Sequence, residues 1–350
     1  MLKGFTPDSS LPAQPAGWDE ELGFEYREAD AFWMACWTAG GGWEPGRLYE
    51  HQGARFELSP GANVFQYGQG IVEGLKARRS AGGPVSLFRP VDHARRLRQS
   101  AAYLAMQAPP VDEIVQAVQA TVQANGRWVP AYGRGSLYVR PAIIGSGTVL
   151  GVRPASEYLF YVFTSPVGGY LGGDRLLVLS GVHRAAPHGI GTAKAAGNYA
   201  ASLRPQQIAH ERGYADVLYL DARESRYVEE LSGATFMVIL KDGTMVAPSL
   251  GSILPGITRD SIITLAREVF GWTVVERRLS LDEVLHDAAE AFYTGTATIL
   301  APVTTINVMG VDHPVGTGEV GARAMQLRKL LDQIQAREQP DLWSWLVDVP

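Results

Sequence analysis

The chain has 350 residues, which is too long for one ordinary hydrophobic core and fits two domains of roughly 150 to 180 residues each. Its net charge of −5, with no block of like charges, argues against nucleic acid or an anionic membrane as the main partner. Cys36 is the only cysteine, which excludes an internal disulfide and a cysteine-based zinc cluster and favours a cytoplasmic location. No apolar run is long enough to predict a membrane span, and residues 1–19 lack the apolar core of a signal peptide.

The first half of the chain alternates predicted strands with predicted helices. Asp92 is expected to cap a helix whose Leu97, Ala101 and Leu104 recur on one face, and a second helix is expected at 112–125. Residues 65–78 place glycines beside aromatic and charged side chains and are expected to line a cleft. Strands are expected at 32–37, 47–58, 136–144 and 157–165.

A glycine-rich stretch divides the chain near its middle. Residues 166–174 hold four glycines in nine positions and interrupt every periodic pattern. We therefore predict an N-terminal domain at 1–165, a linker at 166–174 and a C-terminal domain at 175–350. A glycine-rich linker that crosses between two domains is also a favoured place for a cleft.

The second half begins with a predicted strand at 175–182. A helix is expected at about 198–210, where Pro205 removes one backbone hydrogen bond and bends or splits the helix. Asp242-Gly243 predicts a hairpin, and Ile262, Ala266 and Val269 share one face of a helix that continues through Phe270. Further strands are expected at 215–221, 227–240, 244–246, 272–276 and 291–294, and further helices at 280–287 and from about 320 onward.

Two segments of the second half carry groups that suit a pyridoxal phosphate site. Lys194 lies in the small-residue segment His188-Gly-Ile-Gly-Thr-Ala-Lys194, and a predicted strand carries Glu229 and Glu230. In such enzymes a lysine forms a Schiff base with the cofactor, and a carboxylate keeps the ring nitrogen protonated. Each group also has an ordinary explanation, as a solvated loop lysine or a surface glutamate pair. Adjacent strand residues point to opposite faces, so one glutamate can lie inside while the other is in solvent.

Phosphate-binding candidates occur at three places. Leu254-Pro-Gly-Ile-Thr258 precedes a helix whose backbone N–H groups and dipole attract anions, although Thr258 as a simple N-cap would give the same pattern. Thr294-Gly-Thr-Ala297 offers hydroxyls and amides at a strand end, where a plain turn is the alternative. Arg96 lies at the edge of the buried face of its helix, whereas Arg95 and Arg98 are expected to face water.

Arg140 stands inside the hydrophobic strand segment Tyr138-Val-Arg-Pro141, where a charge needs an anionic partner. That partner is either structural or a substrate carboxylate, and the residues alone favour neither.

Sequence motifs for nucleotide and metal sites are missing from the chain. Neither of the glycine-rich nucleotide motifs is present, and the histidines show no H-E-x-x-H pairing, so we expect no metal site.

Taken together, these motifs resemble the fold-type-IV pyridoxal phosphate enzymes, and in particular the branched-chain amino acid aminotransferases. The resemblance runs from about Ala31 to the C-terminus and includes Leu150-Gly-Val-Arg-Pro154. It implies a small N-terminal α/β domain and a larger C-terminal domain with a β-barrel-like core. It also implies a cytoplasmic homodimer in which Tyr67 and the loop 150–154 serve the neighbouring subunit's site.

The resemblance assigns roles residue by residue. Lys194 is the catalytic lysine, Glu230 pairs with the pyridine nitrogen and Tyr199 binds the ring's phenolic oxygen. Arg96, Ile257, Thr258 and Thr296 match phosphate-binding positions. The remaining implied cofactor-binding positions are Ser232, Gly233 and Leu254. The implied substrate-binding positions are Tyr67, Val72, Gly74, Tyr138, Arg140, Val152, Tyr170, Thr296 and Ala297.

The implied reaction is the reversible, ping-pong transfer of an amino group between L-leucine, L-isoleucine or L-valine and 2-oxoglutarate, as in branched-chain amino acid biosynthesis. The alternatives are a D-amino acid aminotransferase, a lyase of aminodeoxychorismate type, or a protein that stores the cofactor without turnover. Val72 replaces the family's usual phenylalanine and Thr235 its usual asparagine, and Pro205 interrupts a helix that is normally continuous. No cysteine stands near Thr296, so no thiol switch is expected there.

Overall fold

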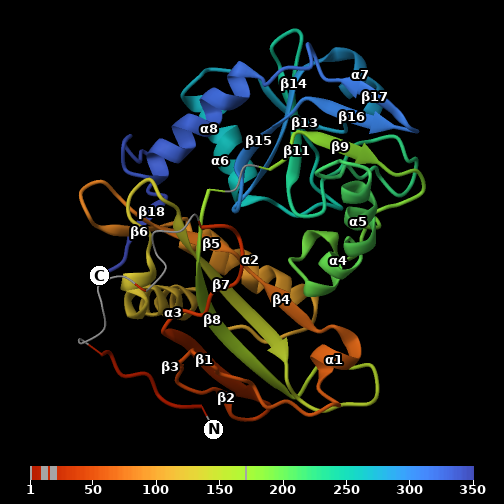
Figure 1. The fold of residues 1–350 in the computed structure, drawn as a ribbon. Coiled ribbons are helices and arrows are strands. Elements are labelled where there is room, and N and C mark those ends of the chain that lie inside the picture. Colours follow the sequence, from red (N-terminus) through yellow and green to blue (C-terminus); the bar gives the residue numbers. More distant parts are fainter. Residues whose placement is uncertain (1, 9–14, 16–21, 170–171) are drawn as a thin grey trace. The chain divides into compact units, whose positions relative to one another are not determined.

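The computed structural model describes residues 2–8, 15, 22–169 and 172–350. The chain forms two compact units. Unit 1 comprises Met1–Tyr170, Ala193–Gly197 and Ile334–Pro350, and unit 2 comprises Leu171–Thr192 and Asn198–Gln333. The predicted mixed α/β architecture is confirmed, because both units combine sheets with helices (Figure 1).

Unit 1 is built on a nine-stranded sheet in which all the named strands pair in antiparallel fashion. Along its main path the order is β18-β6-β5-β7-β8-β1-β2, while β3 pairs with β1 and β4 pairs with β7. The strands are β1 (Ala31–Thr38), β2 (Gly42–Trp43), β3 (Arg47–Glu50), β4 (Gly70–Val72), β5 (Leu75–Arg79), β6 (Val85–Phe88), β7 (Ser136–Gly145), β8 (Glu157–Val167) and β18 (Leu346–Asp348).

Two helices, α2 (Pro90–Tyr103) and α3 (Val111–Ala124), supply the core of unit 1 together with one face of this sheet. Leu97 and Ile114 from the helices share that core with Leu137 and Val139 of β7. Because side chains alternate along a strand, Tyr138 and Arg140 are directed to the opposite face of the sheet. Unit 1 also contains the short helices α1 (Asn63–Tyr67) and η1 (Gly126–Trp128).

Unit 2 contains two smaller sheets. The four-stranded sheet has the order β10-β9-β16-β17, and the five-stranded sheet has the order β13-β12-β11-β14-β15. The residues Phe236, Val238 and Ala291 of the larger sheet lie in the main core of this unit with Leu176 and Ile306 of the smaller one. The strands are β9 (Arg175–Val178), β10 (Asp216–Val217), β11 (Thr235–Leu240), β12 (Met245–Pro248), β13 (Val274–Arg277), β14 (Ala288–Gly295), β15 (Ile299–Val303), β16 (Thr305–Val308) and β17 (Val311–Pro314).

The helices of the second half alternate with these strands along the sequence. The helices of the second half are η2 (Ile190–Thr192), α4 (Ala196–Ala200), α5 (Leu203–Glu211), α6 (Ile257–Glu268), α7 (Leu281–Asp287) and α8 (Ala322–Gln335). None of the described helices of the whole chain has the length and apolar character needed to cross a membrane.

Pro205 splits the helix that was expected at 198–210 into α4 and α5. It is the third residue of α5, within the first turn. Backbone N–H groups in a first turn have no partner inside the helix, so Pro205 removes no intrahelical hydrogen bond there. The predicted split is confirmed, and the predicted loss of a hydrogen bond is wrong.

Several predicted strands are shorter in the structure. Strand β10 covers only Asp216–Val217, and beyond it the Asp221 carboxylate accepts the backbone N–H groups of residues 223, 224, 226 and 227, which folds 221–227 into a loop. The strand expected at 227–240 begins only at Thr235. The strands expected at 47–58 and 175–182 end at Glu50 and Val178.

Two helix predictions also need correction. Asp92 does not cap α2, because the helix starts at Pro90 and Asp92 lies in its first turn, paired with Arg89 and Arg95. Val269 is the C-cap of α6 and is 47% exposed, so it does not share the buried face of Ile262 and Ala266. The hairpin at Asp242-Gly243 is confirmed by the antiparallel pairing of β11 with β12.

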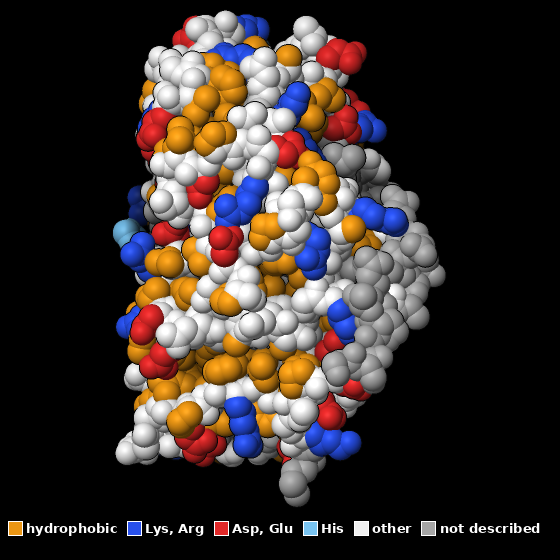
Figure 2. All heavy atoms as spheres, turned by 90° about the vertical axis from the view of Figure 1, so that its left-hand side faces the viewer, with side chains coloured by type: hydrophobic (Ala, Val, Ile, Leu, Met, Phe, Trp, Pro, Cys, Tyr) orange, Lys and Arg blue, Asp and Glu red, His pale blue; other side chains and the backbone are white. Residues whose placement is uncertain are grey.

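Charges of both signs are interspersed on the surface drawn in Figure 2. Lys, Arg, Asp and Glu side chains alternate there with hydrophobic patches, and the described side chains of this face form no continuous basic surface. Such a mixed face offers no extended basic track for a phosphate backbone.

Candidate active site

Lys194 belongs to unit 1, where its backbone is fixed on both sides. Its N–H donates to the Ser100 hydroxyl over 2.9 Å, and its carbonyl accepts the N–H of Val72 over 3.0 Å. The next residue, Ala195, forms an antiparallel bridge with Ile71 of β4. The small neighbours Ala193 and Ala195 are buried, whereas Lys194 is half-buried. The lysine therefore lies between β4 and α2, and two of the contacts of this segment involve residues that sequence reasoning did not select, Ser100 and Ile71.

A buried cluster of Glu73, His93 and Arg96 lies in the same part of unit 1. The Arg96 guanidinium donates to both oxygens of Glu73, from Nε over 2.7 Å and from Nη2 over 2.9 Å, and His93 Nδ1 lies 2.7 Å from the same carboxylate. All three side chains are buried. Burial opposes the charge on Glu73, but Arg96 and His93 outweigh it and hold the pKa of Glu73 far below its usual range.

His93 is neutral at physiological pH. Burial lowers the pKa of His93, and the charges of Arg96 and Lys194 lower it further, while Glu73 acts in the opposite direction. A neutral ring donates its Nδ1–H to the Glu73 carboxylate. Glu73 and His93 thus fix the orientation of Arg96, the residue predicted to bind phosphate. Neither was selected from the sequence, although His93 and Arg96 are three positions apart on one helix face.

The substrate-binding positions predicted on β7 lie together as expected. Arg140 Nη2 donates to the Tyr138 hydroxyl over 3.2 Å, and the guanidinium carbon lies 5.2 Å from the centroid of the Tyr138 ring. Arg140 Nε is buried and has no hydrogen-bond partner. A buried charged donor without a partner is unusual in a native protein and calls for an acceptor such as a carboxylate.

Gly74 and Val72 lie beside this pair. A Cβ atom built on Gly74 would fall 1.9 Å from the Tyr138 hydroxyl oxygen, so any other residue at this position would displace the Tyr138 side chain. Val72 ends β4, is half-buried and pairs with Ala142 of β7. Four predicted substrate positions therefore meet in unit 1, and Val72 also contacts the lysine segment through its backbone.

Tyr67 and the loop 150–154 contact each other rather than these groups. The Tyr67 hydroxyl donates to the Leu150 carbonyl. Leu150 and Val152 are 89% and 88% exposed, values that are high for apolar side chains. Tyr170, another predicted substrate position, lies outside the described residues.

Glu230 belongs to unit 2 and is paired with Arg184. Arg184 Nη1 lies 2.5 Å from Glu230 Oε1, and both side chains are buried. The Arg184 guanidinium carbon is also 5.8 Å from the centroid of the Tyr199 ring, which links the two residues predicted to hold the cofactor ring. Arg184 was not selected from the sequence, where it is one arginine in a loop. A buried carboxylate needs such a partner to remain charged.

Neither of the two adjacent glutamates is solvated, because Glu229 and Glu230 are both buried. They have different partners, since Glu229 Oε1 accepts the Ser252 hydroxyl whereas Glu230 contacts Arg184. Burial raises the pKa of Glu229. The two side chains point to opposite sides, as predicted, but both sides are covered by other parts of the chain.

The segment after Glu230 turns back on itself. Glu230 forms an antiparallel bridge with Thr235, and this closes the turn that contains Ser232 and Gly233. The Ser232 hydroxyl donates to Asp216 over 2.5 Å, whereas a Cβ on Gly233 would meet no atom within 4 Å. The predicted cofactor position Gly233 therefore borders open space.

The start of α6 has the features of an anion site. Its N-cap is Gly256 rather than Thr258, and no side chain caps the helix, whereas Ser280 caps α7 by accepting the N–H of Glu283. Ile257 and Thr258 are the first two helical residues, and both are buried. The interpretation of Thr258 as a simple N-cap is wrong. An N-terminus without a side-chain cap suits a bound phosphate.

The Thr294-Gly-Thr-Ala297 segment lies near the glutamate turn. A Cβ on Gly295 would lie 3.6 Å from the Gly233 carbonyl oxygen, and Thr294 pairs with Thr235 across β11 and β14. The Thr294 hydroxyl is buried without a hydrogen-bond partner. Unit 2 thus gathers a buried carboxylate, an uncapped helix start and an unsatisfied hydroxyl, and this set fits the ring nitrogen and phosphate of pyridoxal phosphate.

Comparison with known proteins agrees with this fit. Residues 70–306 match the family model described as amino-transferase class IV. The chain is 44% identical over 337 residues to branched-chain amino acid aminotransferase 2, chloroplastic, of Humulus lupulus, which covers 95% of this chain and 81% of that protein. It is 39% identical over 341 residues to branched-chain-amino-acid transaminase 1 of Bacillus subtilis, which covers 94% of each.

Solved structures give the same result for the fold. A T.th. branched-chain amino acid aminotransferase, complexed with N-(5'-phosphopyridoxyl)-L-glutamate, superimposes with a TM-score of 0.77 at 30% identity. The match covers 92% of this chain and 99% of that one. The predicted fold-type-IV architecture is confirmed, and the similarity includes residues of both units.

Proposed function

We propose a reaction for this chain from the family to which it belongs, the branched-chain amino acid aminotransferases of class IV, which use pyridoxal phosphate. In this reaction the chain transfers the amino group between L-leucine, L-isoleucine or L-valine and 2-oxoglutarate. The main support is similarity over nearly the full length of both chains to an enzyme whose structure holds a cofactor joined to L-glutamate. L-Glutamate is the aminated form of 2-oxoglutarate, so a ping-pong cycle through one site accounts for both half-reactions.

We assign the roles of the cofactor-binding residues by family resemblance, and their surroundings support the assignment. Pyridoxal phosphate supplies an electron sink that makes the α-proton of a bound amino acid acidic. Lys194 would hold the cofactor at rest, and its amino group would then take and return that proton. Glu230, paired with Arg184, would keep the ring nitrogen protonated, and Tyr199, close to the same arginine, would donate to the phenolic oxygen.

Phosphate binding is assigned to residues that present donors. Ile257 and Thr258 offer backbone N–H groups at the start of α6, Thr296 offers a hydroxyl, and Arg96 offers a guanidinium fixed by Glu73. The Ser232-Gly233 turn and Leu254 are assigned to the cofactor by family resemblance. In unit 2 the start of α6 supplies a helix dipole, and in unit 1 Arg96 supplies a positive charge, and each of these features favours a phosphate dianion.

Substrate recognition is assigned to the groups around Arg140. Its buried Nε lacks a partner, and a substrate carboxylate would supply one together with the Tyr138 hydroxyl. Family resemblance also assigns the backbone amides of Thr296 and Ala297 to the substrate. Val72, flanked by Gly74, shapes the wall for the aliphatic side chain. One methylene changes discrimination by only about 1 to 3 kcal/mol, so all three branched amino acids are accepted.

We further propose a cytoplasmic homodimer. The exposed apolar residues Leu150 and Val152, held by the contact of Tyr67 with Leu150, suit a surface that completes the site of a partner subunit. Tyr170 is assigned to the same substrate side by family resemblance. The single cysteine, Cys36, is consistent with a reducing compartment.

A single-turnover titration tests the assignment. The purified, cofactor-loaded protein is mixed with L-leucine, D-leucine and L-alanine in parallel, and the visible absorbance of the cofactor is followed. We expect conversion to the aminated cofactor with L-leucine, none with D-leucine and little with L-alanine. Lys194→Ala should abolish the conversion. Reaction with D-leucine, or silence with all three amino acids, would contradict the proposal and favour another fold-type-IV activity.

A further inference from the structure

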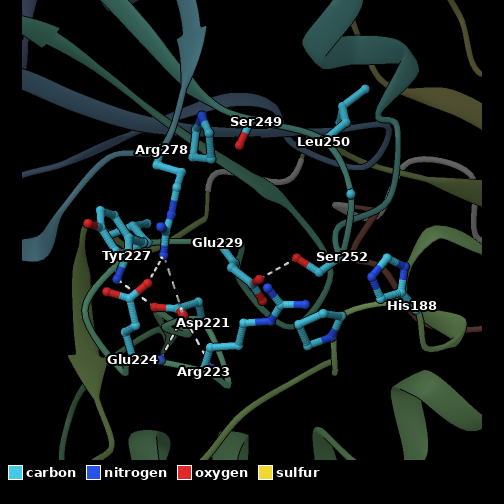
Figure 3. Close-up of a pocket in the computed structure, with 14 residues that line it drawn as sticks. His188, Asp221, Arg223, Glu224, Tyr227, Glu229, Ser249, Leu250, Ser252 and Arg278 are labelled. Atoms are coloured by element: carbon cyan, nitrogen blue, oxygen red, sulfur yellow. Dashed lines mark hydrogen bonds and ion pairs between the residues drawn. The ribbon is translucent and has the colours of Figure 1, made fainter.

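Unit 2 contains a cavity on the side of the 227–230 segment to which Glu229 points. Its volume is about 320 Å³. Pro187 and His188 contribute one wall, residues 248–252 another, and residues 221–229 the floor, with Arg278 at one end. Figure 3 shows the side chains of Glu229, Ser252 and His188 gathered on one side, and Glu224, Tyr227 and Arg278 on the other.

Glu229 is the unsatisfied group of this cavity. The residue is buried, with only 8% of its surface exposed. One carboxylate oxygen accepts the Ser252 hydroxyl, whereas the other, Oε2, is buried and has no hydrogen-bond partner. A buried carboxylate oxygen without a donor is costly. We propose that this cavity is a ligand-binding site for a small molecule bearing a primary ammonium group, which donates to Glu229 Oε2.

The other charged groups of the cavity already have partners. Asp221 accepts four backbone N–H groups of its own loop. Arg278 pairs with Glu224 at 2.5 Å, and its guanidinium carbon lies 3.5 Å from the centroid of the Tyr227 ring. Burial raises the pKa of Glu229 and the charge of Asp221 adds to this effect, so a cation bound at this carboxylate would stabilise its charged form.

An ammonium group fits this carboxylate better than other cations do. Only one oxygen of Glu229 lacks a donor, so a single donor satisfies it, whereas the fork of a guanidinium would place its second donor on the oxygen that already accepts the Ser252 hydroxyl. Among the described residues, no group of three or more His, Cys, Asp or Glu side chains is placed to hold a metal ion. A compact point donor therefore matches the site.

The size and walls of the cavity limit the rest of the ligand. About 320 Å³ is at the lower end of the range for small-molecule sites. Pro187, Val228, Pro248 and Leu250 supply apolar surface for a short alkyl chain. Arg223 is exposed at the rim, and its guanidinium pairs with no carboxylate of the described residues, so a ligand carboxylate can bind there.

The cavity adjoins two elements of the proposed cofactor site. Glu229 is the residue next to Glu230, and Ser252 lies in the loop that leads into α6. Gly191, just before Lys194 in sequence, packs so closely on this loop that a Cβ would lie 1.9 Å from the Ser252 carbonyl oxygen. A ligand at Glu229 would thus touch the same segments without occupying the cofactor site.

Isothermal titration calorimetry with n-butylammonium chloride at pH 8 tests the proposal. The protein carries the cofactor in its pyridoxamine form, which has no aldehyde to react with an amine. We expect saturable binding with one site per chain, weakened about tenfold or more in Glu229→Gln, because a charge-assisted hydrogen bond is lost. No saturable binding to the wild type, or equal binding to this variant, would overturn the proposal and leave Glu229 bonded to water only.

Two further variants keep the result interpretable. Glu224→Gln is the matched control, because its carboxylate is in the same cavity but already pairs with Arg278, and it should bind the probe as the wild type does. Leu250→Trp fills the cavity from a loop residue that is 47% exposed, and it should block the probe even if Glu229→Gln does not fold. Unimpaired binding to Leu250→Trp would place the probe elsewhere and contradict the proposal.

Comparing the affinity of the cavity for L-leucine with its affinity for n-butylammonium shows whether the natural ligand is an amino acid or a simple amine. If an amino acid is the natural ligand, L-leucine should bind this site more tightly than n-butylammonium, and Arg223→Gln should remove the difference. If a simple amine is the ligand, L-leucine should bind no better and Arg223→Gln should change neither affinity. L-leucine binding that persists in Glu229→Gln is assigned to the proposed active site.

Discussion

At the scale of single residues, Gly74 provides the space in which the Tyr138 hydroxyl reaches Arg140. We predict that Gly74→Ala displaces Tyr138, because the new Cβ would lie 1.9 Å from its hydroxyl oxygen. The displaced tyrosine no longer supports the substrate carboxylate. The KM for L-leucine should rise about tenfold or more, whereas cofactor affinity should remain unchanged. Steady-state kinetics and cofactor titration measure the two effects.

Gly82→Ala is the control for this variant. A Cβ at Gly82 meets only Pro84, at an ordinary contact distance of 3.8 Å. Its kinetics should match those of the wild type. An unchanged KM in Gly74→Ala would remove Tyr138 from the substrate site.

Glu229 leads to a prediction about pH. Burial raises its pKa above the ordinary value of 4.5, so the folded state binds this proton at higher pH than the unfolded state does. The charged form therefore costs stability above the folded pKa, and this cost disappears as the pH falls through that pKa toward 4.5. Glu229→Gln should raise the Tm of the ligand-free protein at pH 8, by an amount that shrinks toward about pH 4.5. Thermal unfolding at several pH values measures the difference, and an equal gain at every pH would exclude this cause.

At the scale of elements, α6 and α7 show two ways to begin a helix. Ser280 caps α7 with its side chain, whereas α6 starts at Gly256 without such a cap. A Cβ on Gly256 would lie 2.9 Å from the Thr235 hydroxyl and 3.2 Å from the Arg259 Cβ, so Gly256→Ala must shift the start of α6. We predict that this variant binds pyridoxal phosphate about tenfold more weakly, because the N–H groups no longer meet the phosphate.

Ser280→Ala is expected to change stability without changing cofactor binding. Loss of this cap should lower the free energy of unfolding by about 1 kcal/mol. Cofactor affinity should not change, because α7 carries none of the proposed phosphate donors. Denaturant unfolding and cofactor titration of both variants separate stability from binding. Weaker cofactor binding in Ser280→Ala than in Gly256→Ala would contradict the assignment of α6.

At the scale of the whole molecule, the exposed loop 150–154 bears on assembly. We predict that Val152→Asp shifts the proposed dimer toward the monomer and lowers kcat, because a charge would enter the proposed apolar interface and the loop would no longer serve a partner's site. Light scattering after size-exclusion chromatography measures the assembly. Leu342→Asp changes another apolar residue, 75% exposed, and should leave both properties unchanged. A monomeric wild type, or a dimeric and fully active Val152→Asp, would contradict the proposal.

The sequence by itself predicted the order of the elements and, through the family resemblance, the residues of the candidate site. Hydrophobic periodicity located α3, β7 and β8 to within two residues, because these elements bury one face along their whole length. Lys194, Glu230 and Arg140 stood out because a charge among small or apolar neighbours is a local feature. The ends of strands were less predictable, since in 221–227 a single carboxylate, Asp221, takes the backbone hydrogen bonds that a sheet would otherwise hold.

Only the tertiary structure decided which partner each charged group has. Arg96 and Glu73 are 23 positions apart, and Arg184 and Glu230 are 46 positions apart, so no local pattern links them. Alternation along the strand correctly separated Glu229 from Glu230, but it allowed one of them to lie in solvent. The structure buries both, because a loop containing Ser252 covers the second side. A strand pattern reports the direction of a side chain, whereas burial depends on what the rest of the chain places against that side.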